Sequence, residues 1–548
     1  MHGVEFLQLL LVLVLVLLLT KPIGLYLAKV LDPQEKTFLD FALKPVEKSL
    51  YRICHIDREE QNWKEYAKSL LVFSAISLLF TFSILFFQNY LPLNPQKMGR
   101  LNVDLLINTA ISFMTNTNWQ AYSGENSLSY FSQMAGLTVQ NFTSAAVGIC
   151  VAAVLVRSFV LKLTTKIGNF WVDLIRVTLY FLLPLSLVGA ACFISEGVPQ
   201  NFSVYIETKT LEGSSQVLPQ GPIASQEAIK LLGTNGGGYT NANSAHPYEN
   251  PTPFSHLLQM LFIFLIPAGQ IYYFGYVIKK SKHAWCIFVS LLLIFLMGVV
   301  VSAYFEAKGN PAFEQMGLYG GNWEGKESRL GIFSSALYSC ITTVVSCGSS
   351  ALSFDSMTPL GGLIPLLNME LNEVIFGGVG SGLFSLLLFV LLSIFIAGLI
   401  IGRTPEYLGK KIETQDIKMI VLAFLPFVLL VHLFTAIACF TDWGTSVLGN
   451  RGPHGFSEML YAFTSTSCNN GSAFAGLQAN TLAYNLSTAL CMLLGRFLTI
   501  GAVLALAGSF AKKTIHPETE SSFPISSLIF IILLISVIFL LGALTFLP

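Results

Sequence analysis

The sequence predicts an all-α polytopic membrane protein with ten transmembrane helices. Hydrophobic residues make up 53% of the 548-residue chain and charged residues only 11%, whereas soluble domains are about one quarter charged. A chain this apolar cannot cover a folded surface with groups that water solvates. Phe and Gly contribute 43 and 44 residues, a mixture common in membrane-spanning helices. Ten apolar segments are long enough, or nearly so, to cross a hydrocarbon core of about 30 Å.

The first apolar segment could belong to a signal peptide, but it lacks a basic leading region and a small-residue cleavage site. We therefore expect it to be retained as the first helix. The ten expected spans have the approximate limits 4–20, 68–87, 128–156, 177–195, 255–278, 284–305, 378–402, 419–440, 484–510 and 523–546.

Lys and Arg residues are distributed unevenly between the two sets of connecting loops. The loops after the first, third, fifth, seventh and ninth spans, with their flanks, carry 22 of them, and the alternate loops carry eight. Such residues mark the cytoplasmic side of a membrane protein. We therefore expect the basic loops inside the cell and both termini outside.

Composition also excludes several classes of function. Lys and Arg total 31 and Asp and Glu total 31, so we expect no broad basic face for nucleic acid. The nine cysteines lack the spacing of metal ligands. The chain contains neither G-x-x-x-x-G-K-[ST] nor an Asp-Lys-Thr-Gly phosphorylation motif. Its expected cytoplasmic loops are too short for a nucleotide-binding domain. We expect no ATP site and no catalytic residues in this chain.

Each of the four long outer loops contains a moderately apolar stretch that ends in small polar residues. The turns lie near residues 116, 235, 347 and 469, at similar intervals, and such a spacing indicates a repeated structural unit. The stretches read DLLINTAISFMTNTNWQ (104–120), SQEAIKLLGTNGGGY (225–239), FSSALYSCITTVVSCGSS (333–350) and FSEMLYAFTSTSCNNGSAFAG (456–476). The predicted units are a first helix with its cytoplasmic loop (1–67), four repeats (68–156, 177–278, 284–402 and 419–510) and a last helix (523–548).

These stretches are too short to cross the bilayer as helices. They can enter it partway if protein surrounds them and their non-helical backbone lines a water-filled path. The carboxyl end of a short helix carries partial negative charge, and carbonyls around an axis can replace the water shell of a cation. Gly236, Gly348 and Gly471 permit backbone angles that other residues resist. A single such stretch is more simply a surface loop rich in turn formers, but four on one side favour a filter.

The polar ends of the four stretches, with two further segments, carry a resemblance to a known family. They are TNTNWQAYSGE (115–125), GTNGGGYTNANSAHPYENPTP (233–253), SCGSS (346–350), CNNGSAFAGL (468–477), FGGVGSGL (376–383) and GRTPEYLGKKIE (402–413). Together they resemble the KdpA family, the potassium-binding subunits of bacterial high-affinity potassium-transporting ATPases. The first loop has no glycine between Thr115 and Gln120, so its carbonyl geometry must come from the residues between them.

The resemblance implies four membrane-pore-membrane repeats with one extra helix at each end, in a bacterial plasma (inner) membrane. It implies that the chain selects extracellular K⁺, the transported ion, and works with the P-type ATPase subunit KdpB and the small subunits KdpC and KdpF. In the family, the ion passes to KdpB through an intramembrane tunnel. The implied K⁺ filter residues are Asn116, Thr117, Asn118, Gln120, Thr234, Asn235, Gly236, Cys347, Gly348, Asn469, Asn470 and Gly471.

Arg496 is a full charge inside a strongly apolar span. Such a residue is costly and is a functional hypothesis by default. It lies about 18 Å of helix below the outer end of its span, near the midplane. We expect a fixed cation below the filter that repels a second K⁺ and discourages straight conduction to the cytoplasm. A structural pair with a carboxylate such as Glu373, or snorkelling, is the alternative.

Two further residues belong to this hypothesis. Glu373 lies in the return segment of the third loop, whose glycines suggest a broken or looped helix, where a carboxylate could attract a cation or pair with Arg496. An exposed turn is the alternative for Glu373. Arg403 opens the GRTPEYLGKK stretch and fits a subunit contact or simple anchoring at the cytoplasmic side equally well.

Two other functions stay open at this stage. A stand-alone K⁺ channel or cation–K⁺ symporter of the same superfamily would share the four loops, although the GRTPEYLGKK and AHPYENP stretches favour the pump subunit. An integral-membrane enzyme is the third possibility, but no His, Asp and Glu constellation recurs at helical spacing.

Overall fold

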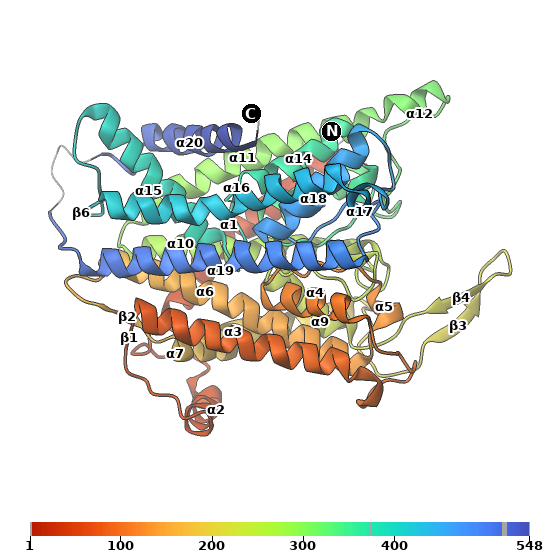
Figure 1. The fold of residues 1–548 in the computed structure, drawn as a ribbon, viewed down its shortest axis with the longest axis horizontal. Helices are drawn as coiled ribbons and strands as arrows, with labels where there is room; N and C mark the ends of the chain where they lie inside the picture. Colours follow the sequence, from red (N-terminus) through yellow and green to blue (C-terminus); the bar gives the residue numbers. More distant parts are fainter. Residues whose placement is uncertain (1–2, 373, 518–522, 547–548) are drawn as a thin grey trace.

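The computed structural model describes residues 3–372, 374–517 and 523–546, and most of them are helical (Figure 1). Within these residues, ten helical segments are long and apolar enough to cross a membrane, which confirms the predicted fold class. They are Glu5–Leu31, Trp63–Phe86, Ser132–Val160, Phe170–Ser195, Pro253–Val277, Ser281–Gln315, Gly382–Ile401, Thr414–Phe440, Leu482–Lys512 and Leu528–Phe546.

Most spans are single α-helices, and two contain a stretch of π-helix. The helices of the spans are α1 (Gly3–Leu31), α3 (Trp63–Phe86), η2 (Ser132–Thr138) with α6 (Val139–Val160), α7 (Phe170–Arg176) with η3 (Val177–Leu182) and α8 (Leu183–Ser195), α10 (Pro253–Val277), α11 (Ser281–Lys308) with α12 (Pro311–Gln315), α15 (Gly382–Ile401), α16 (Thr414–Phe440), α19 (Leu482–Lys512) and α20 (Leu528–Phe546).

Shorter elements connect the spans. The helical ones are α2 (Asp40–Ile53), η1 (Gln88–Tyr90), α4 (Val103–Met114), α5 (Gly124–Ser127), α9 (Ile223–Leu232), η4 (Asn243–Ala245), α13 (Ile332–Val344), η5 (Phe354–Ser356), α14 (Pro359–Glu370), α17 (Asp442–Thr445) and α18 (Pro453–Cys468). Three antiparallel pairs of short strands complete the fold: β1 (Gln61–Asn62) with β2 (Lys166–Gly168), β3 (Ile206–Lys209) with β4 (Ser215–Leu218), and β5 (Glu406–Tyr407) with β6 (Lys410–Lys411).

Four of the short helices occupy equivalent places in the four predicted repeats. Each packs between the helix that precedes it and the helix that follows it: α4 with α3 and α6, α9 with α8 and α10, α13 with α11 and α14, and α18 with α16 and α19. At 10–16 residues each, they are about 15–24 Å long, too short to span the hydrocarbon core. The first helix, α1, packs against α10, and the last, α20, packs against α11 and α15, so both lie outside the repeats.

The first span is longer than the sequence predicted. The expected limit at residue 20 is wrong, because α1 continues through Lys21 and Pro22 to Leu31. A proline inside a membrane helix is tolerated when neighbouring groups satisfy the freed backbone. The 29 residues of α1 extend about 43 Å, so its carboxyl end projects beyond the hydrocarbon core.

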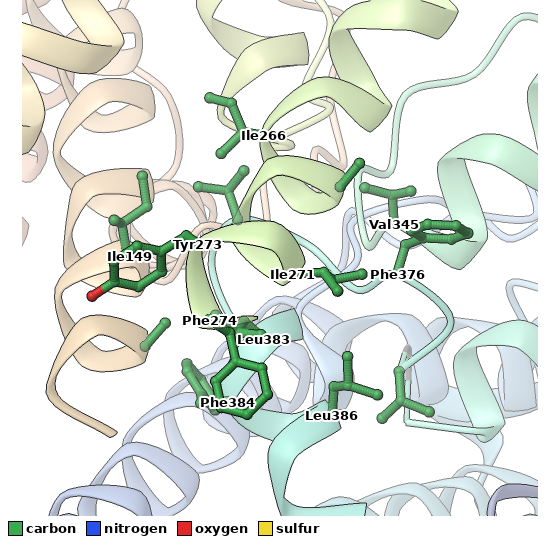
Figure 2. Packing of buried hydrophobic residues seen from close by; sticks show 14 of the residues in the cluster. Ile149, Ile266, Ile271, Tyr273, Phe274, Val345, Phe376, Leu383, Phe384 and Leu386 are labelled. Carbon is green, nitrogen blue, oxygen red and sulfur yellow. The ribbon is translucent and has the colours of Figure 1, made fainter. Parts of the chain in front are cut away.

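The return segment of the third repeat is broken, as its glycines suggested. Helix α14 ends at Glu370 and α15 begins at Gly382, with irregular backbone in the described residues between them. Phe376 has a positive φ of 68°, and its ring lies 5.1 Å from each of the rings of Phe264 and Phe288. Figure 2 shows Phe376 beside Val345 in the buried hydrophobic cluster that includes residues of α6, α10 and α15. The break is therefore packed into the core.

Lys410, in strand β6, is hydrogen-bonded to the ends of two spans, α6 and α19 (left in Figure 1). Lys410 is fully buried, and its ammonium donates to the carbonyls of Ser158 at 2.7 Å and Phe510 at 2.6 Å, and to that of Leu161. These carbonyls lie at the carboxyl ends of α6 and α19, where a cation is favoured. Burial lowers the pKa of Lys410 to about 8, and the Lys513 ammonium acts in the same direction.

We expect Lys410→Met to lower the thermal stability of the protein by about 3 kcal/mol, because it leaves three buried carbonyls without donors. The matched control is Lys411→Met, at the adjacent but exposed position, which should change stability little. Thermal unfolding of the two purified variants in detergent measures the difference. Equal melting temperatures would contradict this role for Lys410.

Candidate functional site

The four loops that follow α4, α9, α13 and α18 meet in a closed ring. A Cβ atom added to a glycine of one loop would fall on the next loop, so only glycine fits at these contacts. A Cβ on Gly236 would lie 1.4 Å from the carbonyl oxygen of Cys347, and one on Gly348 would lie 2.3 Å from that of Asn470. A Cβ on Gly471 would lie 1.9 Å from the carbonyl oxygen of Thr117, and one on Gly237 would lie 2.8 Å from the Cβ of Asn118. The contacts join the first loop to the fourth, the fourth to the third, the third to the second and the second to the first.

The amide groups of the ring point back into the short helices. In each loop, one N–H donates to a carbonyl five residues earlier, near the end of the helix. The N–H groups of Thr117, Asn235, Cys347 and Asn470 donate to the carbonyl oxygens of Ser112, Lys230, Thr342 and Ser465 at 2.9, 2.8, 2.9 and 2.8 Å, respectively. The same bond in all four loops shows that the repeats share one backbone geometry.

Two positive φ angles flank the residue that makes this bond. They are 66° and 54° at Asn116 and Asn118, 49° and 82° at Thr234 and Gly236, 52° and 72° at Ser346 and Gly348, and 64° and 98° at Asn469 and Gly471. The same pair of left-handed angles recurs in all four loops. The carbonyls of Thr117, Cys347 and Asn470, each between two such residues, approach the neighbouring loops, as the close contacts described above show.

This register corrects two details of the sequence prediction. The equivalent turn residues are Asn116, Thr234, Ser346 and Asn469, so the expected positions 235 and 347 are each one residue late. Asn118 occupies the position that is glycine in the other three loops. Asparagine adopts left-handed angles more readily than most residues, which explains how the first loop reaches this geometry without a glycine.

Polar side chains of the loops are occupied by neighbouring groups. Ser144 Oγ donates to Asn116 Oδ1 at 2.7 Å, and Asn118 Nδ2 donates to Asn141 Oδ1 at 2.8 Å. In the other loops, Val379 N donates to Thr234 Oγ1 at 2.8 Å, and Asn469 Nδ2 donates to Thr117 Oγ1 at 2.9 Å. These side chains hold the loops in place. The buried Asn118 Oδ1 accepts no hydrogen bond, so it stands beside the backbone carbonyls as an oxygen that could bind a ligand.

Two cavities are lined by residues of the loops. The larger, about 710 Å³, is lined by residues of all four loops, including Asn118, Gln120, Gly236, Gly348 and Gly471. Gln120 is half-buried there and donates to the Tyr122 hydroxyl at 3.3 Å. A second cavity, about 20 Å³, is lined by Asn469 and Arg496 among others and has room for about one water-sized particle.

Arg496 fastens the broken segment of the third repeat. Its guanidinium is buried and donates to the Gly380 carbonyl at 2.5 Å and the Ser144 carbonyl at 3.3 Å. The hypothetical partner Glu373 lies outside the described residues, so this pair stays a prediction. Arg403 is exposed and directly follows Gly402, the left-handed cap of α15 with a φ of 73°.

The structure therefore brings together the twelve predicted filter residues, while Arg496 lines the small cavity beside Asn469 and Arg403 lies apart. Sequence reasoning missed two residues of the same region, Lys230 and Asn243. Lys230 is fully buried, and Asn243 lines the larger cavity. The signal for Lys230 was a Glu-x-x-Lys pair on the short helix of the second outer loop. The sequence contained no comparable signal for Asn243.

A model of the family described as "KdpA: Potassium-transporting ATPase A subunit" matches residues 10–548. The chain belongs to this family. KdpA relatives include a "Potassium-transporting ATPase potassium-binding subunit" of Solibacter usitatus, 52% identical over 97% of this chain and 93% of the relative. Another, from Klebsiella pneumoniae strain 342, has the same printed name and is 51% identical over 100% of this chain and 98% of the relative.

A solved structure shares the fold of this KdpA chain. It is described as the potassium transporter TrkH from Vibrio parahaemolyticus, with a TM-score of 0.53 and 14% sequence identity. The match covers 90% of this chain and 98% of that one. At this identity the likeness concerns the fold alone.

Proposed function

We propose that this chain is the potassium-binding and potassium-selecting subunit of an ATP-driven, high-affinity K⁺ import complex. The observation that carries the proposal is the closed ring of four loops, each with its amides bonded back to a short helix and its carbonyls facing the other loops. Such an arrangement can replace the hydration shell of a monovalent cation. Membership of the KdpA family and the names of the relatives support K⁺ as the ion.

The proposed ligands are backbone carbonyl oxygens rather than side chains. The carbonyls of Thr117, Cys347 and Asn470 are those that approach the neighbouring glycines most closely, and Asn235 occupies the equivalent position of the second loop. The carboxyl ends of α4, α9, α13 and α18 precede the ring, so their dipoles add negative potential at its centre. A K⁺ ion would enter from the larger cavity, where Gln120 lines the approach.

Energy must come from another chain under this proposal, because the sequence carries no nucleotide-binding or phosphorylation motif. We infer a non-catalytic role beside the P-type ATPase subunit KdpB, with KdpC and KdpF as accessory subunits. The ion would leave the filter sideways, through an intramembrane tunnel into KdpB. Arg496, as a fixed cation below the ring, would oppose a straight path. We keep the proposal that Arg403 forms a subunit contact. Glu373 lies outside the described residues, and its proposed role is to attract a cation or pair with Arg496.

The proposed location is the bacterial plasma membrane. An even number of spans places both termini on the same side, and the excess of Lys and Arg in the alternate loops puts that side outside. The larger cavity then opens to the exterior, where an importer must collect its ion.

The test is purification of the chain with its partners from a bacterial membrane. We expect an ATPase to co-purify and its activity to rise with K⁺ at micromolar concentrations. Reconstitution in vesicles separates this role from that of a channel or symporter, since ATP-dependent K⁺ uptake requires the ATPase. K⁺ flux through the isolated chain alone, with no associated ATPase, would contradict the proposal.

A further inference from the structure

Loops three and four share an anchor that the second loop lacks. In each, a tyrosine of the short helix is hydrogen-bonded to the serine that follows the ring glycine. The Tyr338 and Ser349 hydroxyls lie 2.8 Å apart, and so do those of Tyr461 and Ser472. These bonds fix the outer end of each loop to its own helix.

The second loop has glycine at the serine position. This is Gly237, and a Cβ there would lie 2.8 Å from the Cβ of Asn118. Because the first loop carries a side chain at position 118, its neighbour must carry none at 237. The second loop therefore cannot use the serine anchor and needs another support for its outer carbonyls.

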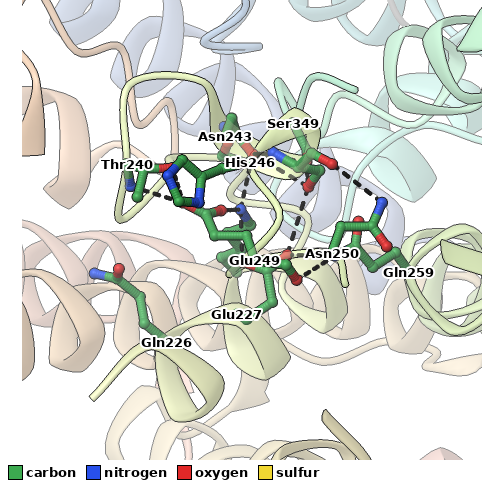
Figure 3. A network of polar contacts seen from close by, with 12 residues as sticks. Gln226, Glu227, Thr240, Asn243, His246, Glu249, Asn250, Gln259 and Ser349 are labelled. Atoms are coloured by element: carbon green, nitrogen blue, oxygen red, sulfur yellow. Dashed lines mark hydrogen bonds and ion pairs between the residues drawn. The ribbon is translucent and has the colours of Figure 1, made fainter. Parts of the chain in front are cut away.

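Asn243 occupies that role. Its Nδ2 donates to the Gly236 carbonyl at 2.7 Å, and Gly236 is the ring glycine of this loop. Its Oδ1 accepts from Ser349 Oγ at 3.1 Å, which joins the second loop to the third. Figure 3 shows Asn243 beside Ser349 in this network.

The orientation of the Asn243 amide is set by Lys230. The Lys230 ammonium donates to Asn243 Oδ1 at 2.7 Å. An ammonium group only donates hydrogen bonds, so the oxygen of the amide must face Lys230. The Nδ2 group is then left to face the Gly236 carbonyl.

The ammonium itself lies between two buried glutamate side chains. Lys230 Nζ lies 2.7 Å from Glu227 Oε2 and 2.5 Å from Glu249 Oε2, and all three side chains are at most 1% exposed. Glu249 Oε1 accepts from both the N–H and the hydroxyl of Thr240 at 2.7 Å. Burial alone would raise the pKa of Glu249, but the Lys230 charge and the hydrogen bonds together hold it below its usual value.

We propose that Lys230 and Asn243 are positioning residues for ion selection, in which Lys230 fixes the Asn243 amide and Asn243 holds the Gly236 carbonyl at the outer end of the ring. Asn243 thereby replaces, in the second loop, the tyrosine–serine anchor of the third and fourth loops. The inference rests on the proposed function, because it assigns the outer geometry of the same filter.

The first test is Asn243→Ala in the full complex, with ATPase activity measured against K⁺ and Rb⁺ concentration. Loss of one hydrogen bond on a filter carbonyl should raise the half-saturating K⁺ concentration about tenfold. It should also change the ratio of the Rb⁺ and K⁺ half-saturating values and leave the maximal rate within about twofold. The control is Asn89→Ala, an exposed asparagine outside the four loops and the larger cavity, which should match the wild type in both values.

The second test asks whether Lys230 acts through Asn243. Lys230→Met combined with Glu249→Gln removes the ammonium without leaving that carboxylate unpaired. We expect this double variant to raise the half-saturating K⁺ concentration as Asn243→Ala does. The triple variant, which adds Asn243→Ala to these two changes, should raise it no further. Failure of the double variant to assemble would assign Lys230 a role in folding and overturn its positioning role. Asn243→Asp tests the bond to Gly236 separately, since a carboxylate still accepts from Lys230 but offers no N–H to that carbonyl. It should weaken K⁺ affinity at least as much as alanine.

The outcomes separate this inference from the proposed function. A wild-type complex that does not respond to K⁺ overturns the proposed function. If the wild-type complex responds to K⁺ but Asn243→Ala or Asn243→Asp keeps the wild-type K⁺ affinity and Rb⁺/K⁺ ratio, the positioning role of Asn243 is overturned. If the fold-change in K⁺ affinity of the triple variant equals the product of those of the double variant and Asn243→Ala, the role of Lys230 is overturned, because independent sites add their free energies.

Discussion

Gly236→Ala should raise the half-saturating K⁺ concentration of the assembled complex at least about a hundredfold. An added Cβ would lie 1.4 Å from the Cys347 carbonyl oxygen, so one of the two loops must move. That carbonyl approaches the second loop, and its displacement would remove a proposed ligand and open the contact between the second and third loops. A change of about 3 kcal/mol in ion binding corresponds to this factor.

Two effects contribute to that loss, and a control separates them. Gly236 has a φ of 82°, which strains any other residue, and Gly213 in the β3–β4 turn has a φ of 84° but open space around its Cβ position. Gly213→Ala therefore carries the strain without the collision, and it should leave K⁺ affinity unchanged. Measurement of K⁺-stimulated ATPase activity in both variants tests the argument. Near-wild-type affinity in Gly236→Ala would show that the ring does not select the ion.

Composition and hydropathy were enough to predict the ten spans, because membrane insertion depends on length and apolarity. The four loops were also predictable, since their spacing and small polar residues repeat along the chain. The limit at residue 20 failed because Lys21 and Pro22 normally end a helix in water, whereas the protein around α1 and the membrane allow it to continue to Leu31.

The finer parts of the site depend on contacts between distant segments. The need for glycine at position 237 comes from Asn118, more than a hundred residues earlier, and no local pattern shows it. Asn243 sits in a polar loop where asparagine is common, so its bond to Gly236 could be found only from the fold. The buried Lys230 was visible in the sequence, but its partner Glu249 was not, because the loop between them brings the two together.

The proposed barrier role of Arg496 predicts that its charge serves function rather than stability. It is buried within α19, and the described contacts of its guanidinium are to the carbonyls of Gly380 and Ser144. Removal of water from a charge is costly, and this cost offsets part of what the two hydrogen bonds contribute, so we expect loss of the guanidinium to lower stability by no more than about 2 kcal/mol. At an effective dielectric constant of about 20, it would repel a K⁺ ion about 8 Å away by about 2 kcal/mol. This repulsion lowers the occupancy of a site below the ring about thirtyfold.

We therefore expect Arg496→Met to fold but to transport inefficiently. In vesicles containing the complex, passive K⁺ leak without ATP should rise by about an order of magnitude, and K⁺ moved per ATP should fall. Arg496→Lys keeps the charge and should restore a low leak. As a contrast, Arg157→Met breaks the partly buried 2.7 Å ion pair with Asp173 near the end of α6, which should cost about 3 kcal/mol of stability without affecting coupling. If Arg496→Met lowers only stability and the purified complex remains tightly coupled, Arg496 is a structural link between α19 and the broken segment, and the barrier to straight conduction lies elsewhere.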